Sequence, residues 1–231
     1  MCILLPMRYT VNRCGESGPS AAAVPMEISG GWETAEAGKI VMFQDNGSGH
    51  KPDVDFRVLY NSGFLFVRFD VRDRYVRSVQ TKPQSMVCLD SCAEFFVEPP
   101  GGIGYFNFEV NAGGTPHVSR IEIPVRTPTG FEKWEFVAPE WIEKLNISRT
   151  MPRVVDPEIA EPTAWTVSYR IPFALFTAYG ASEVPHSGSV WRANFYKCGD
   201  NTSHPHWGYW NDIGAKLDFH QPARFGELAF C

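Results

Sequence analysis

The chain has 231 residues and a formal net charge of −5 at pH 7, and 44% of its residues are hydrophobic while 20% are charged. These proportions describe a globular protein and exclude a disordered one. The acidic balance and the lack of basic runs exclude the electrostatic footprint of a nucleic-acid-binding protein. No apolar run approaches the ~18 residues of a membrane span. We therefore expect neither nucleic acid nor a spanned membrane among its partners, and the sequence indicates nothing about oligomeric state.

Turn formers and aromatic residues are both abundant. Aromatic residues make up 14% of the chain, and 20 Gly and 18 Pro supply many reversals. Short strands separated by frequent turns are typical of β-sandwiches and β-barrels. The length fits a single domain. We expect an all-β fold.

The N-terminal segment differs from the rest of the chain. Residues 1–27 are poorly patterned, and 15–23 are rich in Gly, Ser and Ala, so we expect a flexible leader over 1–27 and one domain over 28–231. The apolar patch in MCILLPM is too short for the ~7–15-residue core of a signal peptide, and no basic residue precedes it. We therefore expect no signal peptide here. Export, for example to the periplasm, stays open for a chain that has already lost its leader.

The first clear strands lie over 54–59 and 64–71, where side chains alternate on both sides of an Asn-Ser-Gly turn. Residues 75–86 lack periodicity and predict a loop or a short helix. Further alternation predicts strands over 119–126, 165–171 and 190–198, and a short final strand over 227–230. Residues 139–145 and 173–179 predict one or two short helices. The aromatic tail over 201–226 predicts a loop.

The densest pattern lies in residues 89–111, where two strands flank a Pro-Pro-Gly-Gly turn. In the second strand Phe106, Phe108 and Val110 share one face. Tyr105, Asn107, Glu109 and Asn111 share the other face, as the period of two requires. The hairpin therefore has an apolar face for the core and a polar face that is either solvated surface or a binding wall.

The order of the segments resembles carbohydrate-binding module family 9, in the broad sense that includes DOMON-like β-sandwich domains. The matching stretches are Trp32, 56–60, 64–67, 71–73, 90–91, 94–97, 105–111, 165–173, 191–196, Trp207, 219–222 and 225–226. The resemblance implies a sandwich of two antiparallel sheets, in immunoglobulin-like or jelly-roll-like layers. It also implies saccharide binding without catalysis, in a polysaccharide-processing bacterium.

The best-known members of the family, which are attached to xylanases, hold a sugar between two tryptophans, bond its hydroxyls with polar side chains and carry calcium in supporting loops. In this chain the first clamp position falls just before Asp90, at 86–88, and the second falls at or near Phe219. Glu109 stands where those members have an arginine. The resemblance implies calcium at carboxylates such as Asp73 or Asp90, although no D-x-D-x-D run is present. No other cofactor is expected.

Saccharide recognition needs flat aromatic rings and polar groups for paired hydroxyls. If the strands assemble as in the family, the ligand-binding side chains are expected to be Glu94, Asn107, Glu109, Arg192, Asn194 and Tyr196, with Trp210 or Phe219 as the stacking ring. Loops such as the tail make rings available to ligands. The function we expect is a non-catalytic module that binds a mono- or oligosaccharide.

Two other functions stay open. Glu94 and Glu109 on neighbouring strands could supply the paired carboxylates of a glycoside hydrolase. A haem-binding electron-transfer sandwich would need an axial ligand, for which Met86 or His220 could serve. The six cysteines show no repeated metal-type spacing, so we interpret them as small buried hydrophobes rather than as a disulfide, redox or metal site.

Overall fold

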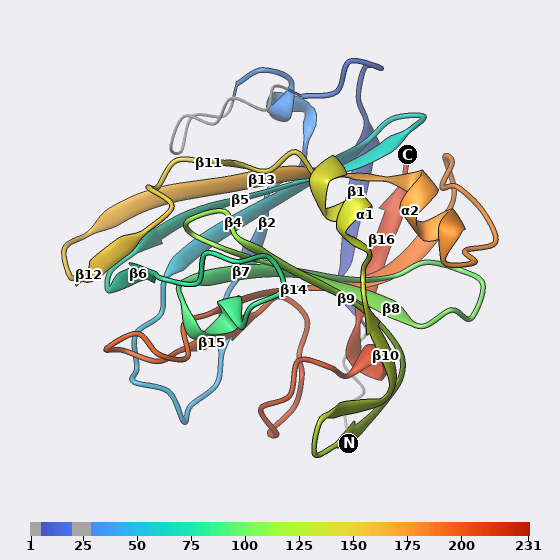
Figure 1. The fold of residues 1–231 in the computed structure, drawn as a ribbon. Coiled ribbons are helices and arrows are strands. Elements are labelled where there is room, and N and C mark those ends of the chain that lie inside the picture. The colour runs from blue at the N-terminus through green and yellow to red at the C-terminus, as the bar shows by residue number, and fades with distance from the viewer. Residues whose placement is uncertain (1–5, 20–28) are drawn as a thin grey trace.

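The computed structural model describes residues 6–19 and 29–231 (Figure 1). Much of the leader expected over 1–27 lies outside these residues, including most of the apolar patch at its start. Residues 8–13, however, form strand β1 (Arg8–Arg13) inside that segment. Val11 is fully buried there, so this part of the N-terminal segment belongs to the folded domain.

Two sheets form the fold, and β1 joins them. The first sheet follows β1 in the order β16 (Gly226–Phe230), β14 (Val190–Cys198), β7 (Cys92–Glu98), β8 (Tyr105–Asn111), β9 (Pro116–Thr127) and β10 (Gly130–Phe136). The second follows β1 in the order β4 (Asp53–Tyr60), β5 (Phe64–Asp73), β13 (Thr163–Pro172) and β11 (Ser148–Arg149). Strand β1 runs parallel to both β16 and β4, whereas the other pairings along this order are antiparallel.

Shorter elements complete the two layers. Strand β2 (Gly38–Ile40) pairs with β4, β15 (Trp207–Tyr209) pairs with β14 and β3 (Met42–Phe43), and β12 (Val155–Ile159) pairs with β6 (Val76–Ser78). The helices are α1 (Pro139–Lys144) and α2 (Phe173–Ala178), with 3₁₀ turns at Trp32–Thr34, Val87–Leu89 and Pro222–Arg224. The expected two-sheet sandwich with short helices is confirmed. No helix in the described part of the chain is long and apolar enough to cross a bilayer.

The core lies between the sheets because each strand turns its apolar face inward. Phe95, Phe108 and Phe195 of the first sheet belong to one buried cluster with Phe56 and Phe69 of the second. The rings of Phe56 and Phe195 stack at 3.6 Å across the two layers. Figure 1 shows the layer of β4, β5 and β13 above the layer of β7 and β8. The outer face of the first sheet therefore does not pack against the second sheet.

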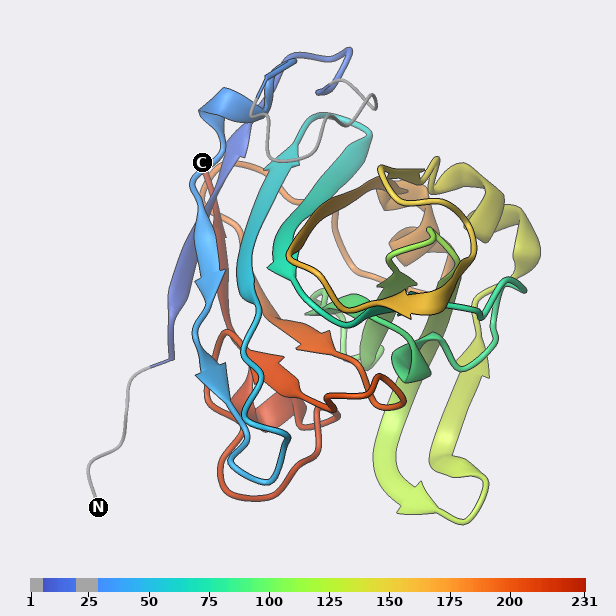
Figure 2. The same cartoon turned by 90° about the vertical axis from the view of Figure 1, so that its left-hand side faces the viewer.

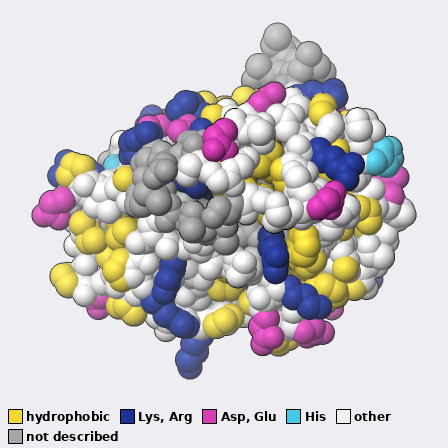
Figure 3. Space-filling model, turned by 90° about the horizontal axis from the view of Figure 1, so that it is seen from above, with side chains coloured by type: hydrophobic (Ala, Val, Ile, Leu, Met, Phe, Trp, Pro, Cys, Tyr) yellow, Lys and Arg dark blue, Asp and Glu magenta, His cyan; other side chains and the backbone are white. Residues whose placement is uncertain are grey.

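Two segments cover that outer face. The β9–β10 hairpin projects beyond the sandwich in both Figure 1 and Figure 2. The tail from 211 to 224 is bonded to side chains of β14 through the backbone of Asn211, Phe219 and Pro222. The sequence pattern predicts a strand over 119–126, within β9, but not β10, the second strand of this hairpin. Seen from above, on the side of the second sheet, basic and acidic side chains are interspersed (Figure 3).

Candidate functional site

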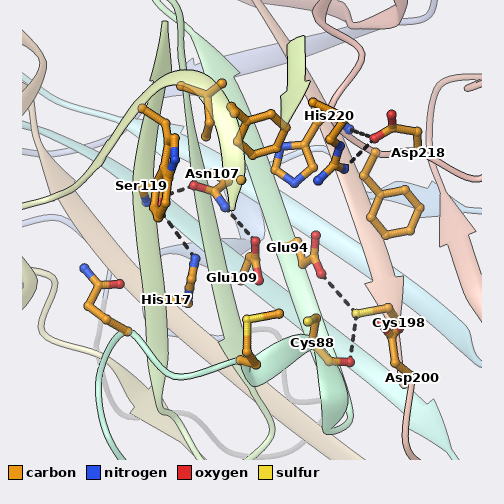
Figure 4. Close-up of a pocket in the computed structure, with 18 of the residues that line it drawn as sticks. Cys88, Glu94, Asn107, Glu109, His117, Ser119, Cys198, Asp200, Asp218 and His220 are labelled. Atoms are coloured by element: carbon orange, nitrogen blue, oxygen red, sulfur yellow. Dashed lines mark hydrogen bonds and ion pairs between the residues drawn. The ribbon is translucent and has the colours of Figure 1, made fainter. Parts of the chain in front are cut away.

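The outer faces of β7 and β8 carry the polar row that the sequence pattern predicts. Glu94 and Glu109 are direct cross-strand partners, and Asn107 lies two residues before Glu109 on the same face. Such partners have Cβ atoms about 4.5–5.5 Å apart. Figure 4 shows the two carboxylates directed into the same space. The alternation of the hairpin therefore brings both groups to one place.

That space is a cavity of about 540 Å³, within the range of small-ligand sites. Polar side chains at its floor come from β7, β8, β9 and β14, and aromatic side chains come from β10 and the tail. The lining side chains that matter here are Cys88, Glu94, Asn107, Glu109, His117, Phe131, Trp134, Phe136, Cys198, Asp200, Trp207, Phe219 and His220.

Glu94 and Glu109 are both buried in the sheet. Their exposed fractions are 2% and 7%. The Cys198 thiol donates to Glu94 Oε1 at 3.0 Å, and Asn107 Nδ2 donates to Glu109 Oε1 at 2.6 Å. Asn107 is itself fixed because its Oδ1 accepts from Ser119 N at 2.8 Å. Within the described residues, neither glutamate forms an ion pair with Lys or Arg.

This burial changes the protonation of the pair. Burial raises the pKa of Glu94 well above its usual range, and the neighbouring Glu109 carboxylate raises it further. Burial also raises the pKa of Glu109, against the opposing effects of His117 and of the hydrogen bond from Asn107. The pair therefore holds a proton more readily than two solvated carboxylates would. It can present both a donor and an acceptor to a ligand.

Aromatic rings form the walls of the cavity. Phe131, Trp134 and Phe136 come from β10, and Trp207 and Phe219 come from the tail. Phe219 stacks on the buried Tyr196 ring at 4.1 Å with an interplanar angle of 12°, which fixes its orientation. The indole N–H of Trp207 donates to Asp200 Oδ1 at 2.7 Å.

The hairpin and the tail are tied together above the sheet. Arg126 of β9 pairs with Asp218 at 2.7 Å, and the His220 ring lies 4.6 Å from the Phe131 ring. His220 Nδ1 and the Tyr105 hydroxyl share a hydrogen bond of 2.8 Å. Burial, assisted by the charge of Arg126, lowers the pKa of His220 to about 3. A neutral imidazole thus joins three segments that are distant in sequence.

Comparison with known proteins agrees with this architecture. The profile of carbohydrate-binding family 9 matches residues 32–230. The chain belongs to carbohydrate-binding family 9. No curated protein sequence shows significant similarity to it.

Solved structures show the same fold. A Bacteroides uniformis protein described as a candidate carbohydrate-binding protein is 26% identical, with a TM-score of 0.78 over 98% of this chain and 100% of that one. A carbohydrate-binding family 9 module from Caldicellulosiruptor kristjanssonii in complex with glucose is 13% identical, with a TM-score of 0.59 over 97% of this chain and 96% of that one. Its complex with cellotriose gives the same TM-score, over 97% and 93% of the two chains.

Within this family 9 domain, the cavity brings together only part of the predicted set. Glu94, Asn107, Glu109 and Phe219 line it, and so does Met86, from the predicted position of the first clamp ring. Met86 is 57% exposed. Met86 and His220, the two candidate haem ligands, therefore both face the cavity, and His220 is also bonded to Tyr105.

The other predicted residues lie behind or beside the cavity. The Asn194 side chain bonds the backbone of Asn211, and the Tyr196 hydroxyl donates to Phe219 O at 2.9 Å. Arg192 donates to Pro222 O and pairs with Glu98 at 3.2 Å. Trp210 is buried in the main core against Phe56 and Phe195. Three of the four thus hold the tail in place, and Trp210 packs between the sheets.

The two carboxylates predicted to bind calcium are surrounded by protein donors. Asp90 Oδ2 accepts from Val79 N, Gln80 N and Asn111 Nδ2 at 2.8–2.9 Å. Asp73 is bonded to His50 and lies 3.2 Å from the Lys197 ammonium. Calcium needs six to eight oxygen ligands. The surroundings of Asp73 and Asp90 do not fit that requirement.

The sequence interpretation missed the contribution of β10. Trp134 and Phe136 reach the cavity because the hairpin folds back along the sheet edge. The signal is present in GFEKWEF, where Trp134 and Phe136 alternate with charged residues after a Thr-Gly turn. The pattern does not reveal the contacts of this hairpin with the tail, through Arg126 with Asp218 and Phe131 with His220.

Proposed function

We propose that this domain is a non-catalytic carbohydrate-binding module that takes a short saccharide into the cavity above β7 and β8. The observation that carries the proposal is the joint placement of a polar floor and aromatic walls in a space of about 540 Å³. A pyranose has an apolar C–H face and a rim of hydroxyls, and the cavity offers a surface for each. The glucose and cellotriose complexes of the family 9 relative support this ligand class.

The polar floor suits hydroxyl groups. Glu94, Glu109 and Asn107 are held by the sheet, and Asn107 is further fixed by its bond to Ser119. A rigid array loses little side-chain entropy on binding. A carboxyl pair that retains a proton can both donate to and accept from neighbouring hydroxyls. These three side chains are the proposed polar contacts.

The walls suit the apolar face of the sugar. Phe219 is backed by Tyr196, and Trp134 lies on the hairpin that Arg126 ties to the tail. We assign stacking to Phe219 and Trp134. The exposed Met86 at the rim can add an apolar contact without the flat face of a ring.

Calorimetric titration with glucose, cellotriose and xylo-oligosaccharides tests the proposal. We expect binding to the unmodified domain and a loss of about tenfold or more in affinity for Phe219→Ala and for Trp134→Ala, since tenfold corresponds to ~1.4 kcal/mol. Trp141→Ala is the matched control, because Trp141 lies on α1 and not on the cavity. Absence of binding to a broad glycan array would contradict the proposal.

The paired carboxylates also require a test for catalysis. Glu94 and Glu109 face each other across two strands with raised pKa values, as glycoside hydrolase residues can. Reducing-sugar release should be absent from the wild-type domain. Turnover that disappears in both Glu94→Gln and Glu109→Gln would replace the binding function with a hydrolase. A Soret band in the purified protein would instead support haem.

A further inference from the structure

Two cysteines lie beside Glu94, and one of them, Cys198, lines the cavity. Cys92 and Glu94 are two residues apart on β7 and therefore share a face. Cys198 on β14 is the direct cross-strand partner of Cys92. Both cysteines and the glutamate are buried. The sheet itself thus fixes three side chains with metal-ligating atoms in one place.

The donor atoms are close enough to share one ion. The two Sγ atoms and a carboxylate oxygen of Glu94 all lie within 4.8 Å of one another, the one such group of His, Cys, Asp or Glu donors in the described residues. Cys198 Sγ is 3.0 Å from Glu94 Oε1. Tetrahedral zinc, with bonds of ~2.3 Å to sulfur and ~2.0 Å to oxygen, needs donors about 3.3–3.8 Å apart. Since the three atoms already lie within 4.8 Å of one another, shifts of about 1 Å would reach this spacing.

The chemistry of the donors selects the kind of ion. Thiolate sulfur favours zinc and other soft ions, whereas calcium and magnesium prefer oxygen. Two buried cysteines that served only as hydrophobic packing would not require a carboxylate beside them. Here Glu94, the residue beside them, has no basic partner among the described residues.

The cavity provides access and a fourth ligand. Glu94, Cys198 and Cys88 all line it, so an ion can enter from solvent. The Cys88 backbone oxygen lies 3.6 Å from Cys198 Sγ, and the Cys88 side chain packs on the cluster of Cys92 and Cys198. Figure 4 shows Cys198 between Glu94 and Cys88. A fourth position toward the cavity is open to the Cys88 thiol or to water.

We propose that Cys92, Cys198 and Glu94 bind a thiophilic divalent cation of the zinc class at the floor of the cavity. The ion would bind as the thiols release their protons to solvent, which makes its affinity depend on pH. The site shares Glu94 with the proposed saccharide cavity but does not require saccharide binding. It also gives the cysteines a role that their sequence spacing does not indicate.

Cobalt titration of the reduced, chelator-treated full chain tests the site. We expect one Co²⁺ per chain, a thiolate-to-cobalt charge-transfer band in the near ultraviolet and the visible bands of tetrahedral cobalt, all removed by added Zn²⁺. Cys92→Ala and Cys198→Ala should abolish the charge-transfer band, and Glu94→Gln should weaken zinc binding at least tenfold. Cys14→Ser and Cys231→Ser are the matched controls and should bind as the wild type does.

Circular dichroism shows which variants are folded, and Glu94→Gln keeps the test decisive if an alanine variant unfolds. A reduced, folded wild type without the tetrahedral cobalt spectrum overturns the proposal. A tetrahedral cobalt spectrum that persists in all three variants, Cys92→Ala, Cys198→Ala and Glu94→Gln, also overturns the proposal. Saccharide titration of the chelator-treated protein separates the two functions: sugar binding without cobalt binding overturns the metal site alone, and cobalt binding without sugar binding overturns the saccharide function alone.

Discussion

Strand β14 places two kinds of buried ionisable group on its opposite faces. Lys197 points into the space between the sheets, and the next residue, Cys198, points into the cavity beside Glu94. On the inner face, Lys197 is paired with the opposite charge of Asp73. Among the described residues, the outer-face carboxylates Glu94 and Glu109 form no ion pair with Lys or Arg and are held only by hydrogen bonds from Cys198 and Asn107. The two faces of the first sheet thus separate a structural use of buried charge from a candidate ligand-binding use.

On the inner face, each group meets a partner. Lys197 Nζ lies 3.2 Å from Asp73 Oδ2 and 2.7 Å from His206 Nε2, and it donates to Cys198 O. Although burial acts to raise it, the pKa of Asp73 is held well below its usual range by Lys197 and by His50. Burial, assisted by Lys197, lowers the pKa of His206 to about 3. This network fastens β14 to β5 and to the tail.

On the outer face, burial is not compensated in this way. The pKa values of Glu94 and Glu109 are raised, which means that their charged forms are disfavoured in the folded protein. Such groups reduce stability at neutral pH and are often found where a ligand binds. Burial alone therefore does not distinguish a candidate binding site from a structural ion pair. What distinguishes them is whether the buried charged group has a partner of opposite charge.

The largest expected effect comes from removing the inner cation. Lys197→Met leaves Asp73 buried without its ammonium partner, so we expect the free energy of unfolding to fall by about 3–5 kcal/mol. Urea denaturation measures it, and the double variant Lys197→Met with Asp73→Asn should recover part of the loss. Arg72→Met, which breaks an exposed pair with Asp53, should cost less than ~1 kcal/mol. Unchanged stability in Lys197→Met would mean that the inner network is not structural.

The next effect is the pH dependence caused by His206. Its pKa is about 3 in the folded protein and 6.5 as the ordinary value, so the unfolded chain takes up a proton as the pH falls below ~6.5. The stabilisation is present above that pH and is lost toward pH 3. From pH 8 to pH 5, His206 should account for ~2 kcal/mol of the fall in unfolding free energy.

His206→Asn should make the change in unfolding free energy with pH shallower by that amount, measured by urea denaturation at each pH. The exposed His186 offers the control variant His186→Asn, which should retain the wild-type slope. An equal slope in wild type and His206→Asn would show that His206 is not held neutral by the fold.

The smallest expected effect is that of Glu109 on the outer face, whose contribution to stability falls, rather than rises, as the pH increases. Because the pKa of Glu109 is raised in the folded protein, its contribution is favourable below ~4.5 and is lost as the pH rises through the folded value. Glu109→Gln removes this loss. We expect the variant to melt at a higher temperature than the wild type near pH 8, with a gain smaller than the effect of His206, and to match it near pH 4. A lower melting temperature near pH 8 would show that Glu109 is stabilising, and the contrast between the two faces would fail.

Much of the domain could be predicted from sequence because its main strands alternate strictly. The inward Phe106 and Phe108 and the outward Asn107 and Glu109 are confirmed as opposite faces of β8. The same reasoning could not detect β1, since its pairing with β16 joins residues from the two ends of the chain. Nor could it tell that Trp210 packs in the core whereas Phe219 lines the cavity, since both lie in the aromatic tail.

Alternation by itself determined which side chains of β7, β8 and β14 share the outer face, because side-chain direction in a strand is a local property with a period of two. Tertiary structure decided which part of that face is a cavity. The tail covers Asn194 and Tyr196, and the β9–β10 hairpin encloses Glu94 and Glu109. These covering segments are held by contacts such as Arg126 with Asp218, 92 residues apart in the chain. Pairings at that separation leave no periodic signal in the sequence, so only the folded chain reveals them.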